Sequence, residues 1–120
     1  MMRQILKSKI SYATVTGTEL YYEGSITIDK KIAEEAGLIA GEKVEVLNMN
    51  NGVRFETYVI LGEENSGVIC LNGPAARLGI VGDKVIILSY AFYAEDEIEE
   101  AKTRLVVLDE KNRIKTSTLR

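Results

Sequence analysis

The sequence predicts one mainly β domain, a closed barrel with short helices. Two features support this prediction: segments rich in β-branched and aromatic residues recur along the 120 residues, and one segment occurs twice. Residues 38–47 match residues 79–88 without gaps, and each copy is preceded by a predicted short strand and short helix. Two copies are too few for a solenoid, so we expect two interlocked strand–helix–strand units in a pseudo-symmetric barrel.

Strands are expected where β-branched and aromatic residues concentrate, at residues 9–16, 42–48, 53–61, 67–71 and 84–93. Asn50-Asn51-Gly52 joins two of these segments, and Asn and Gly tolerate the positive φ that a tight hairpin requires. A further polar turn at residues 109–112 precedes a weak last strand.

Three short helices are expected between the strands. Asp29 can cap a helix over residues 30–36, and Gly37 is placed to end it. The only proline suits the first turn of a helix over residues 74–78. Residues 95–102 are acidic early and basic at the end, as the helix dipole favours.

Composition argues against several classes of function. The net charge of −3 and the pI near 5.1 disfavour a nucleic-acid partner, because neutralising phosphates requires clustered Lys and Arg. No apolar segment approaches membrane-spanning length, and the N-terminal residues lack the apolar core of a signal peptide. We therefore expect a cytoplasmic protein with no membrane partner.

The chain has one cysteine and no histidine. Cys70 therefore cannot form an intrachain disulfide, and its apolar neighbours predict a small buried hydrophobe rather than a nucleophile. Without histidine, the Ser-His-Asp and Cys-His arrangements and the usual zinc ligand sets are absent, and we expect no metal. An enzyme with this sequence must use Tyr, Lys, Arg, Thr, carboxylates or a group made from the chain itself.

The Gly24–Ser25 bond is a candidate for such a group. Taken alone, Gly-Ser indicates a turn. If the backbone is strained there, however, the Ser25 hydroxyl can attack the Gly24 carbonyl and convert the amide into an ester. Glycine favours the attack because it has no side chain to obstruct it and tolerates unusual φ and ψ. Elimination from the ester would leave dehydroalanine, which hydrolyses to a pyruvoyl group on a new N-terminus.

Several segments, none decisive alone, match one enzyme family in both order and spacing. They are Lys9, Val15-Thr16, Tyr22-Glu23-Gly24-Ser25, Ile28-Asp29, Asn50-Asn51-Gly52, Glu56-Thr57-Tyr58, residues 70–77 and residues 82–87. With these segments the sequence resembles the pyruvoyl-dependent aspartate 1-decarboxylases over nearly its whole length.

The resemblance implies a double-psi β-barrel that assembles as a homotetramer and cleaves itself between Gly24 and Ser25. The products would be chains 1–24 and 25–120. It also implies decarboxylation of L-aspartate to β-alanine and CO₂, a step towards pantothenate and coenzyme A. Self-cleavage could be spontaneous or could require a separate maturation factor.

The resemblance also implies roles for particular residues. Ser25 would become the pyruvoyl group, which forms a Schiff base with the substrate amine and accepts the electron pair left by decarboxylation. Tyr58 would give a proton to the resulting carbanion. Thr57 would contact the Gly24 carbonyl during self-cleavage and later the substrate.

Substrate binding is implied in the same way. Arg54 would grip one substrate carboxylate through two parallel hydrogen bonds, and Lys9 would hold the other carboxylate or orient the Schiff base. The pocket would also be lined by Asn72, Gly73, Pro74 and Ala75. The backbone N–H groups of this last segment, at the start of a helix, could donate to an anion.

Strand geometry raises a question about this set of residues. In a regular strand, Arg54 and Tyr58 share a face but lie about 13 Å apart, too far for one aspartate, and Thr57 points to the opposite face. Either a bulge distorts this strand, or the site combines residues of two subunits, and we favour the second. The match also departs from the family at Ser11, where many relatives have histidine.

Two other functions stand as alternatives. A double-psi barrel that did not cleave itself would lack an electron sink and could serve only as a non-catalytic binding module. A small DNA-binding barrel would require a basic face, which the acidic pI and the scattered Lys and Arg disfavour. Self-cleavage into two fragments separates the enzyme from the binding module.

Overall fold

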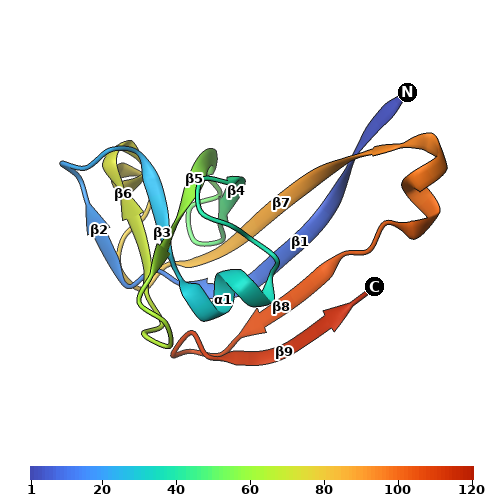
Figure 1. The fold of residues 1–120 in the computed structure, drawn as a ribbon. Helices are drawn as coiled ribbons and strands as arrows, with labels where there is room; N and C mark the ends of the chain where they lie inside the picture. The colour runs from blue at the N-terminus through green and yellow to red at the C-terminus, as the bar shows by residue number, and fades with distance from the viewer.

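The computed structural model describes residues 1–120, and most of the chain is β-strand (Figure 1). The strands are β1 (Met2–Thr14), β2 (Gly17–Glu19), β3 (Ser25–Asp29), β4 (Lys43–Asn48), β5 (Arg54–Gly62), β6 (Ile69–Asn72), β7 (Lys84–Ala94), β8 (Arg104–Leu108) and β9 (Ile114–Leu119). One α-helix, α1 (Lys30–Glu35), and two 3-10 helices, η1 (Gly73–Arg77) and η2 (Glu95–Glu100), connect them.

Hydrogen bonds at Thr16 close the sheet into a barrel. The strand order is β2-β6-β3-β5-β4-β7-β1-β8-β9, which leaves β6 and β1 far apart in that order. The Thr16 amide, just after β1, donates to the Ile69 carbonyl at 2.8 Å, and the Ile69 amide donates to Thr16 Oγ1 at 3.0 Å. These bonds connect the end of β1 to β6 and complete the ring of strands.

The internal repeat corresponds to a pseudo-twofold relation between the halves of the barrel. β4 and β7, one from each copy, pair antiparallel with Val46 opposite Ile87, which occupy the same position in the repeat. The turn glycine of each copy also bonds to the other half. The Gly41 amide donates to the Val59 carbonyl of the second half, and the Gly82 amide donates to the Val15 carbonyl of the first, both at 2.8 Å. Because each half is hydrogen bonded to the other through a strand and a turn glycine, the predicted interlocked double-psi barrel is confirmed.

The two copies build their turns with the same hydrogen bond. Glu42 Oε1 accepts from the Ile39 amide at 3.1 Å, and Asp83 Oδ2 accepts from the Ile80 amide at 3.0 Å. An acidic side chain that accepts a hydrogen bond from a nearby backbone N–H stabilises a turn. The glycine two residues after Ile39 or Ile80 completes that turn. Similar sequence therefore gives similar local structure in both halves.

Nineteen buried hydrophobic residues form one cluster inside the barrel. They come from both halves, and Ile10, Ile28 and Ile69 are essentially inaccessible to solvent. Burying side chains of this size supplies most of the favourable free energy of folding, at about 1.5–3 kcal/mol each. The barrel thus has a single core shared by both repeats.

The structure extends several predicted elements. β1 begins at Met2 rather than at residue 9, because its first residues pair with the end of β7, where Met2 lies opposite Ala94. Figure 1 shows these two segments leaving the barrel together as a long arm. β8, which was not predicted, pairs in parallel with β1 and antiparallel with β9.

The short helices were predicted in the correct places. Asp29 caps α1 by accepting from the Lys31 amide at 2.8 Å, and Gly37 follows the helix with a φ of +73°. The helix containing Pro74 and the helix that starts at Glu95 are both 3-10 helices of one or two turns.

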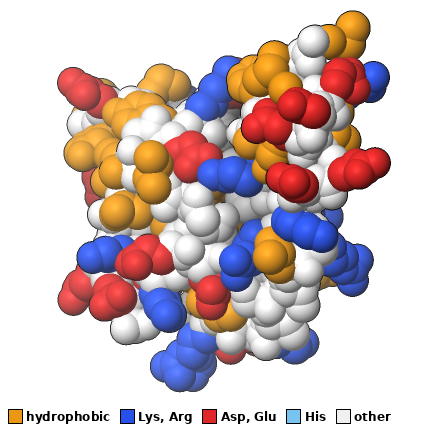
Figure 2. Space-filling model, turned by 45° about the vertical axis from the view of Figure 1, so that its right-hand side comes forward, with side chains coloured by type: hydrophobic (Ala, Val, Ile, Leu, Met, Phe, Trp, Pro, Cys, Tyr) orange, Lys and Arg blue, Asp and Glu red, His pale blue; other side chains and the backbone are white.

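Figure 2 shows charged and hydrophobic side chains interspersed on one face of the molecule.

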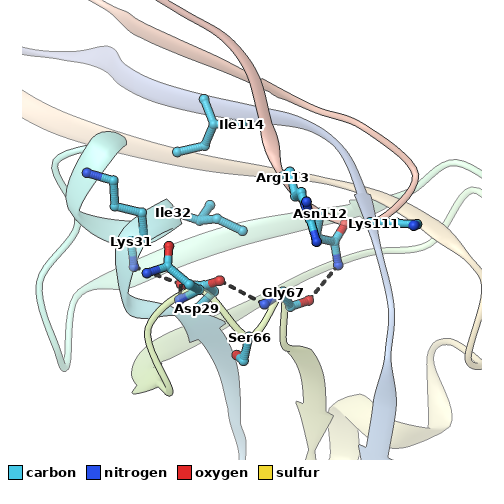
Figure 3. Close-up of a pocket in the computed structure, with 10 residues that line it drawn as sticks. Asp29, Lys31, Ile32, Ser66, Gly67, Lys111, Asn112, Arg113 and Ile114 are labelled. Carbon is cyan, nitrogen blue, oxygen red and sulfur yellow. Dashed lines mark hydrogen bonds between the residues drawn. The ribbon is translucent and has the colours of Figure 1, made fainter.

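Asp29 also connects α1 to the loop between β5 and β6 (Figure 3). Its carboxylate is 2% exposed and accepts from the amides of Lys31, Asn65 and Gly67 at 2.8–3.0 Å. Asp109 makes a similar turn at the surface, where it accepts from the amides of Lys111 and Arg113. These two amides hold the pKa of Asp109 below its usual value.

Replacing the buried carboxylate should therefore cost far more stability than replacing the exposed one. We expect Asp29→Ala to lower the free energy of unfolding by about 2–3 kcal/mol, because three buried amides lose their acceptor. Asp109→Ala should cost much less than Asp29→Ala, since water replaces the carboxylate there. Urea unfolding of both variants measures the difference, and equal losses would contradict this account of Asp29.

Candidate active site

The pairing of β3 with β6 buries Ser25 against Asn72. The two residues lie directly opposite each other at the end of the ladder, and Ser25 is fully inaccessible to solvent. Asn72 Nδ2 donates to Ser25 Oγ at 2.9 Å and to Thr27 Oγ1 at 2.9 Å. Ser25 Oγ in turn contacts the Glu23 carbonyl at 3.4 Å. The hydroxyl predicted to be the nucleophile is thus held in one place by its own strand pair.

Gly73 allows the segment before Ser25 to approach β6. It has a φ of +66°, and a Cβ at this position would lie 2.4 Å from the Tyr22 carbonyl oxygen and 2.9 Å from the Gly24 amide nitrogen. Only glycine leaves room for so close an approach of two backbones. Gly24 itself is not in the left-handed region.

Five of the predicted site residues line one shallow groove of about 310 Å³. They are Gly24, Thr57, Tyr58, Pro74 and Ala75, and the remaining lining residues are Phe55, Glu56 and Leu78. The groove thus joins the end of the segment before Ser25 to β5 and η1. Its position beside the Gly24–Ser25 bond is what a substrate pocket for a group formed at Ser25 would require.

Arg54 and Lys9 do not line this groove. The Arg54 guanidinium is exposed and lies 3.4 Å from Glu45 Oε1 on the neighbouring strand. Lys9 is on β1, and β4 and β7 separate that strand from β5. Within one chain, the two residues expected to bind carboxylates are therefore not brought together with Tyr58.

β5 has no bulge that could bring Arg54 closer to Tyr58. Its pairing with β4 runs without a register shift from Arg54, opposite Leu47, to Tyr58, opposite Lys43. Exposure alternates along this stretch, with Thr57 more buried than either neighbour. The bulge considered from the sequence is excluded, and the alternation of faces holds.

Bulges occur instead on β1. Its register against β7 shifts between Ile10 and Ala13, and Tyr12 has a φ of +61°. Ser11 is half-buried at this irregularity, where the register of the strand changes.

Two residues around Asn72 were not predicted as part of the site. Thr27 accepts the second Asn72 hydrogen bond, and Cys70 Sγ donates to Asn72 Oδ1 at 3.3 Å. Cys70 was expected to be a buried hydrophobe, but it is only half-buried and makes a polar contact. Its position two residues before Asn72 on a strand, hence on the same face, is the signal that could have identified it.

A larger hollow of about 590 Å³ lies at the other end of β3, beside Asp29 (Figure 3). None of the residues predicted for catalysis, processing or substrate binding lines it. Asp29 and Asn72 occupy corresponding positions at the two ends of the antiparallel β3–β6 pair. The Asp29 amide donates to the Val68 carbonyl at one end, and Asn72 pairs with Ser25 at the other. The two hollows occupy matching ends of the β3–β6 pair, and only one contains the Gly-Ser bond.

Comparison with known proteins identifies the family. Residues 1–115 match the family described as aspartate decarboxylase. The chain belongs to this family. A curated aspartate 1-decarboxylase of Caldicellulosiruptor saccharolyticus is 54% identical over 95% of this chain and 89% of its own length. That of Clostridium beijerinckii is 54% identical over 98% of this chain and 95% of its own length. Both relatives are curated as aspartate 1-decarboxylases, which are carboxy-lyases.

Two designed proteins of known structure also align with this member of the aspartate decarboxylase family. The rationally designed mkDPBB_sym_86 protein aligns with 64% of this chain and 90% of its own, at 20% identity and a TM-score of 0.48. The computationally designed msDPBB_sym2 protein aligns with 72% of this chain and 96% of its own, at 18% identity and a TM-score of 0.46. The fold is assigned from the strand pairings. The longest helix in the structure is far too short to cross a bilayer.

Adding a methyl group at Gly73 should disturb the segment before Ser25. We expect Gly73→Ala to lower the free energy of unfolding by about 2–4 kcal/mol, because the Cβ would overlap the Tyr22 carbonyl and φ is positive. Gly37→Ala is the matched control: φ is +73° and no atom lies within 4 Å of the added carbon. That variant should lose only about 1 kcal/mol from strain. Equal losses in urea unfolding would show that the close approach is unimportant.

Proposed function

We propose that the protein decarboxylates L-aspartate to β-alanine and CO₂ in the cytoplasm, for the synthesis of pantothenate and coenzyme A. The proposal includes self-cleavage between Gly24 and Ser25, which gives chains 1–24 and 25–120 and a pyruvoyl group at position 25. Membership of the aspartate decarboxylase family supports the reaction. The observation that supports self-cleavage is a buried Ser25 hydroxyl, hydrogen bonded to Asn72, next to the predicted bond.

The self-cleavage step uses only groups of the chain and one water molecule. Ser25 Oγ forms a bond to the Gly24 carbonyl carbon, the C–N bond to Ser25 breaks, and the hydroxyl proton moves to the freed nitrogen. Loss of the Ser25 α-proton then expels the Gly24 carboxylate and leaves dehydroalanine. Water adds to its imine tautomer, ammonia leaves, and the ketone of the pyruvoyl group remains.

The surroundings of Ser25 suit such a group. The site is inaccessible to solvent, polar contacts come from Asn72, and the groove beside Gly24 is open to a small substrate. A pyruvoyl group supplies a carbonyl that accepts the electron pair left when a carboxylate departs as CO₂. The protein's own contribution is to bind the substrate, orient its departing carboxylate and supply a proton.

Residues of the groove are assigned the later steps. Tyr58, 37% exposed at the rim, donates the proton that replaces the lost carboxylate. Thr57, on the inner face of β5, contacts the Gly24 carbonyl during self-cleavage and the substrate afterwards. Pro74 and Ala75 line the groove beside them, and Pro74 has no N–H to donate.

We further propose that each active site combines residues of two subunits of a homotetramer. Lys9 and Arg54, which would bind the substrate carboxylates, lie outside the groove of their own chain, and a bulge does not bring Arg54 closer. Exposed hydrophobic side chains such as Tyr21 at 98% and Phe92 at 67% are suited to burial against another subunit. A neighbouring chain can then supply the missing cations.

A non-catalytic binding module is the alternative function. It would be favoured by a folded chain that stays intact, because no electron sink would form without cleavage. The groove and the exposed cations could still bind a small diacid in that case.

Purified protein should consist of two fragments rather than one. A denaturing gel and intact mass measurement are expected to show chains 1–24 and 25–120, with the second lacking a free amine at its N-terminus. Ser25→Ala should fold, remain a single chain and have no decarboxylase activity, because no hydroxyl is present to attack. A fully folded wild-type protein that stays uncleaved would leave only the binding module.

Mixing two inactive variants tests the shared site. Ser25→Ala retains Arg54, and Arg54→Ala retains the hydroxyl at Ser25. A site between subunits can therefore take Ser25 from one chain and Arg54 from its neighbour. Co-expression in equal amounts should restore about a quarter of the wild-type activity, by random assembly of the two chains. Each variant alone, and the two proteins mixed after separate assembly, serve as controls. Activity no higher than that of the variants alone would place Arg54 and Ser25 of one chain in the same site.

A further inference from the structure

We propose that the Cys70 thiol is a positioning group for self-cleavage, which holds the Asn72 side-chain amide with its N–H groups turned towards Ser25 and Thr27. The proposal rests on the self-cleavage proposed above. It concerns a residue that does not touch the reacting atoms itself and acts through Asn72.

The orientation of the Asn72 amide is not fixed by the two hydroxyls that it contacts. Ser25 Oγ and Thr27 Oγ1 both lie 2.9 Å from Asn72 Nδ2, and a hydroxyl can either donate or accept. If the amide were turned by 180°, both hydroxyls could instead donate to its carbonyl oxygen. Two further contacts therefore decide which end faces Ser25: the weak bond that the Ser25 hydroxyl donates to the Glu23 carbonyl at 3.4 Å, and the contact of the third neighbour with the amide oxygen.

That third neighbour is Cys70, whose Sγ lies 3.3 Å from Asn72 Oδ1. The S–H group is a weak donor and sulfur is a weak acceptor, and only the observed orientation gives both Asn72 N–H groups an oxygen acceptor while the S–H donates to the amide oxygen. The observed orientation is thus the better one for a thiol. The sulfur lies beside β2, where a Cβ on Gly17 would be at ordinary van der Waals distance, 3.4 Å, from Cys70 Sγ.

The surroundings of Cys70 keep its proton in place. Partial burial, and then the negative charge of Glu19, raise the pKa of the thiol above its ordinary value. A thiolate could only accept and would repel Asn72 Oδ1. At neutral pH the thiol therefore remains a donor, as the observed contact requires.

The orientation matters because Ser25 Oγ gains negative charge during self-cleavage. The charge develops as the oxygen loses its proton and attacks the Gly24 carbonyl, and it develops again when that oxygen leaves as part of the Gly24 carboxylate. An Asn72 N–H directed at this oxygen stabilises both steps, whereas a carbonyl oxygen in the same place would oppose them. Cys70 thus affects the rate of cleavage through Asn72.

The rate of cleavage in freshly made chains tests this proposal. Wild type, Cys70→Ala, Cys70→Val and Cys70→Ser are translated in a cell-free system with a short pulse of labelled amino acid. The precursor and its fragments are then followed with time on a denaturing gel. Cys70→Ala and Cys70→Val should cleave roughly threefold to tenfold more slowly, the change expected from losing one hydrogen bond of modest strength. Cys70→Ser, which keeps a donor, should cleave within about twofold of the wild-type rate.

A control separates positioning from stability. Ser117 on β9 has a buried hydroxyl without a hydrogen-bond partner, so Ser117→Ala removes a side-chain donor far from Asn72 in the sheet order. It should cleave at the wild-type rate. Thermal unfolding of Ser25→Ala chains carrying each Cys70 change shows whether a slow variant is also less stable.

The outcomes are distinct. Slow cleavage in both Cys70→Ala and Cys70→Val, with recovery in Cys70→Ser, supports the positioning role. Wild-type rates in Cys70→Ala and Cys70→Val, or slow cleavage in all three variants, would overturn it. A wild-type chain that folds but never cleaves would instead overturn the proposed self-cleavage itself.

Discussion

The antiparallel pairing of Ser25 with Asn72 is the contact on which the rest of the site depends. A hydroxyl and an amide buried this deeply are tolerated because they are hydrogen bonded to each other and to the neighbouring polar groups. The pairing also places the next residue, Gly73, against the backbone of Tyr22 and Gly24. One strand pair thus positions the proposed nucleophile, its hydrogen-bond donor and the bond to be broken. β5 and η1 then form the groove beside it.

The two ends of the β3–β6 pair differ in their polar side chains although the barrel is pseudo-symmetric. At one end the carboxylate of Asp29 accepts three backbone amides and fixes a loop. At the other end Asn72, which carries an amide in place of a carboxylate, can donate to Ser25 instead. A carboxylate at the second position could only accept, and would oppose negative charge on the serine oxygen. The choice between these two side chains separates a structural turn from the turn at the proposed cleavage site.

Sequence reasoning located the strands and helices of the barrel well because these depend on local signals. The repeat, the hairpin at Asn50-Asn51-Gly52 and the Asp29 cap all appear where the residues indicated. The first part of β1 and the whole of β8 were missed, since they form by pairing with segments that are distant in the chain. Weak strand signals become strands only when a partner is available.

The sequence by itself determined the mainly β class, the pseudo-symmetric repeat, the family resemblance and most of the residues that line the groove. Only the tertiary structure decided that Gly73 has a left-handed backbone, that Lys9 lies outside the groove and no bulge brings Arg54 closer to Tyr58, and that Cys70 contacts Asn72. The physical reason is that residue types record chemistry and local conformation. Distances between groups on different strands depend on register and sheet order, which the folded chain alone establishes.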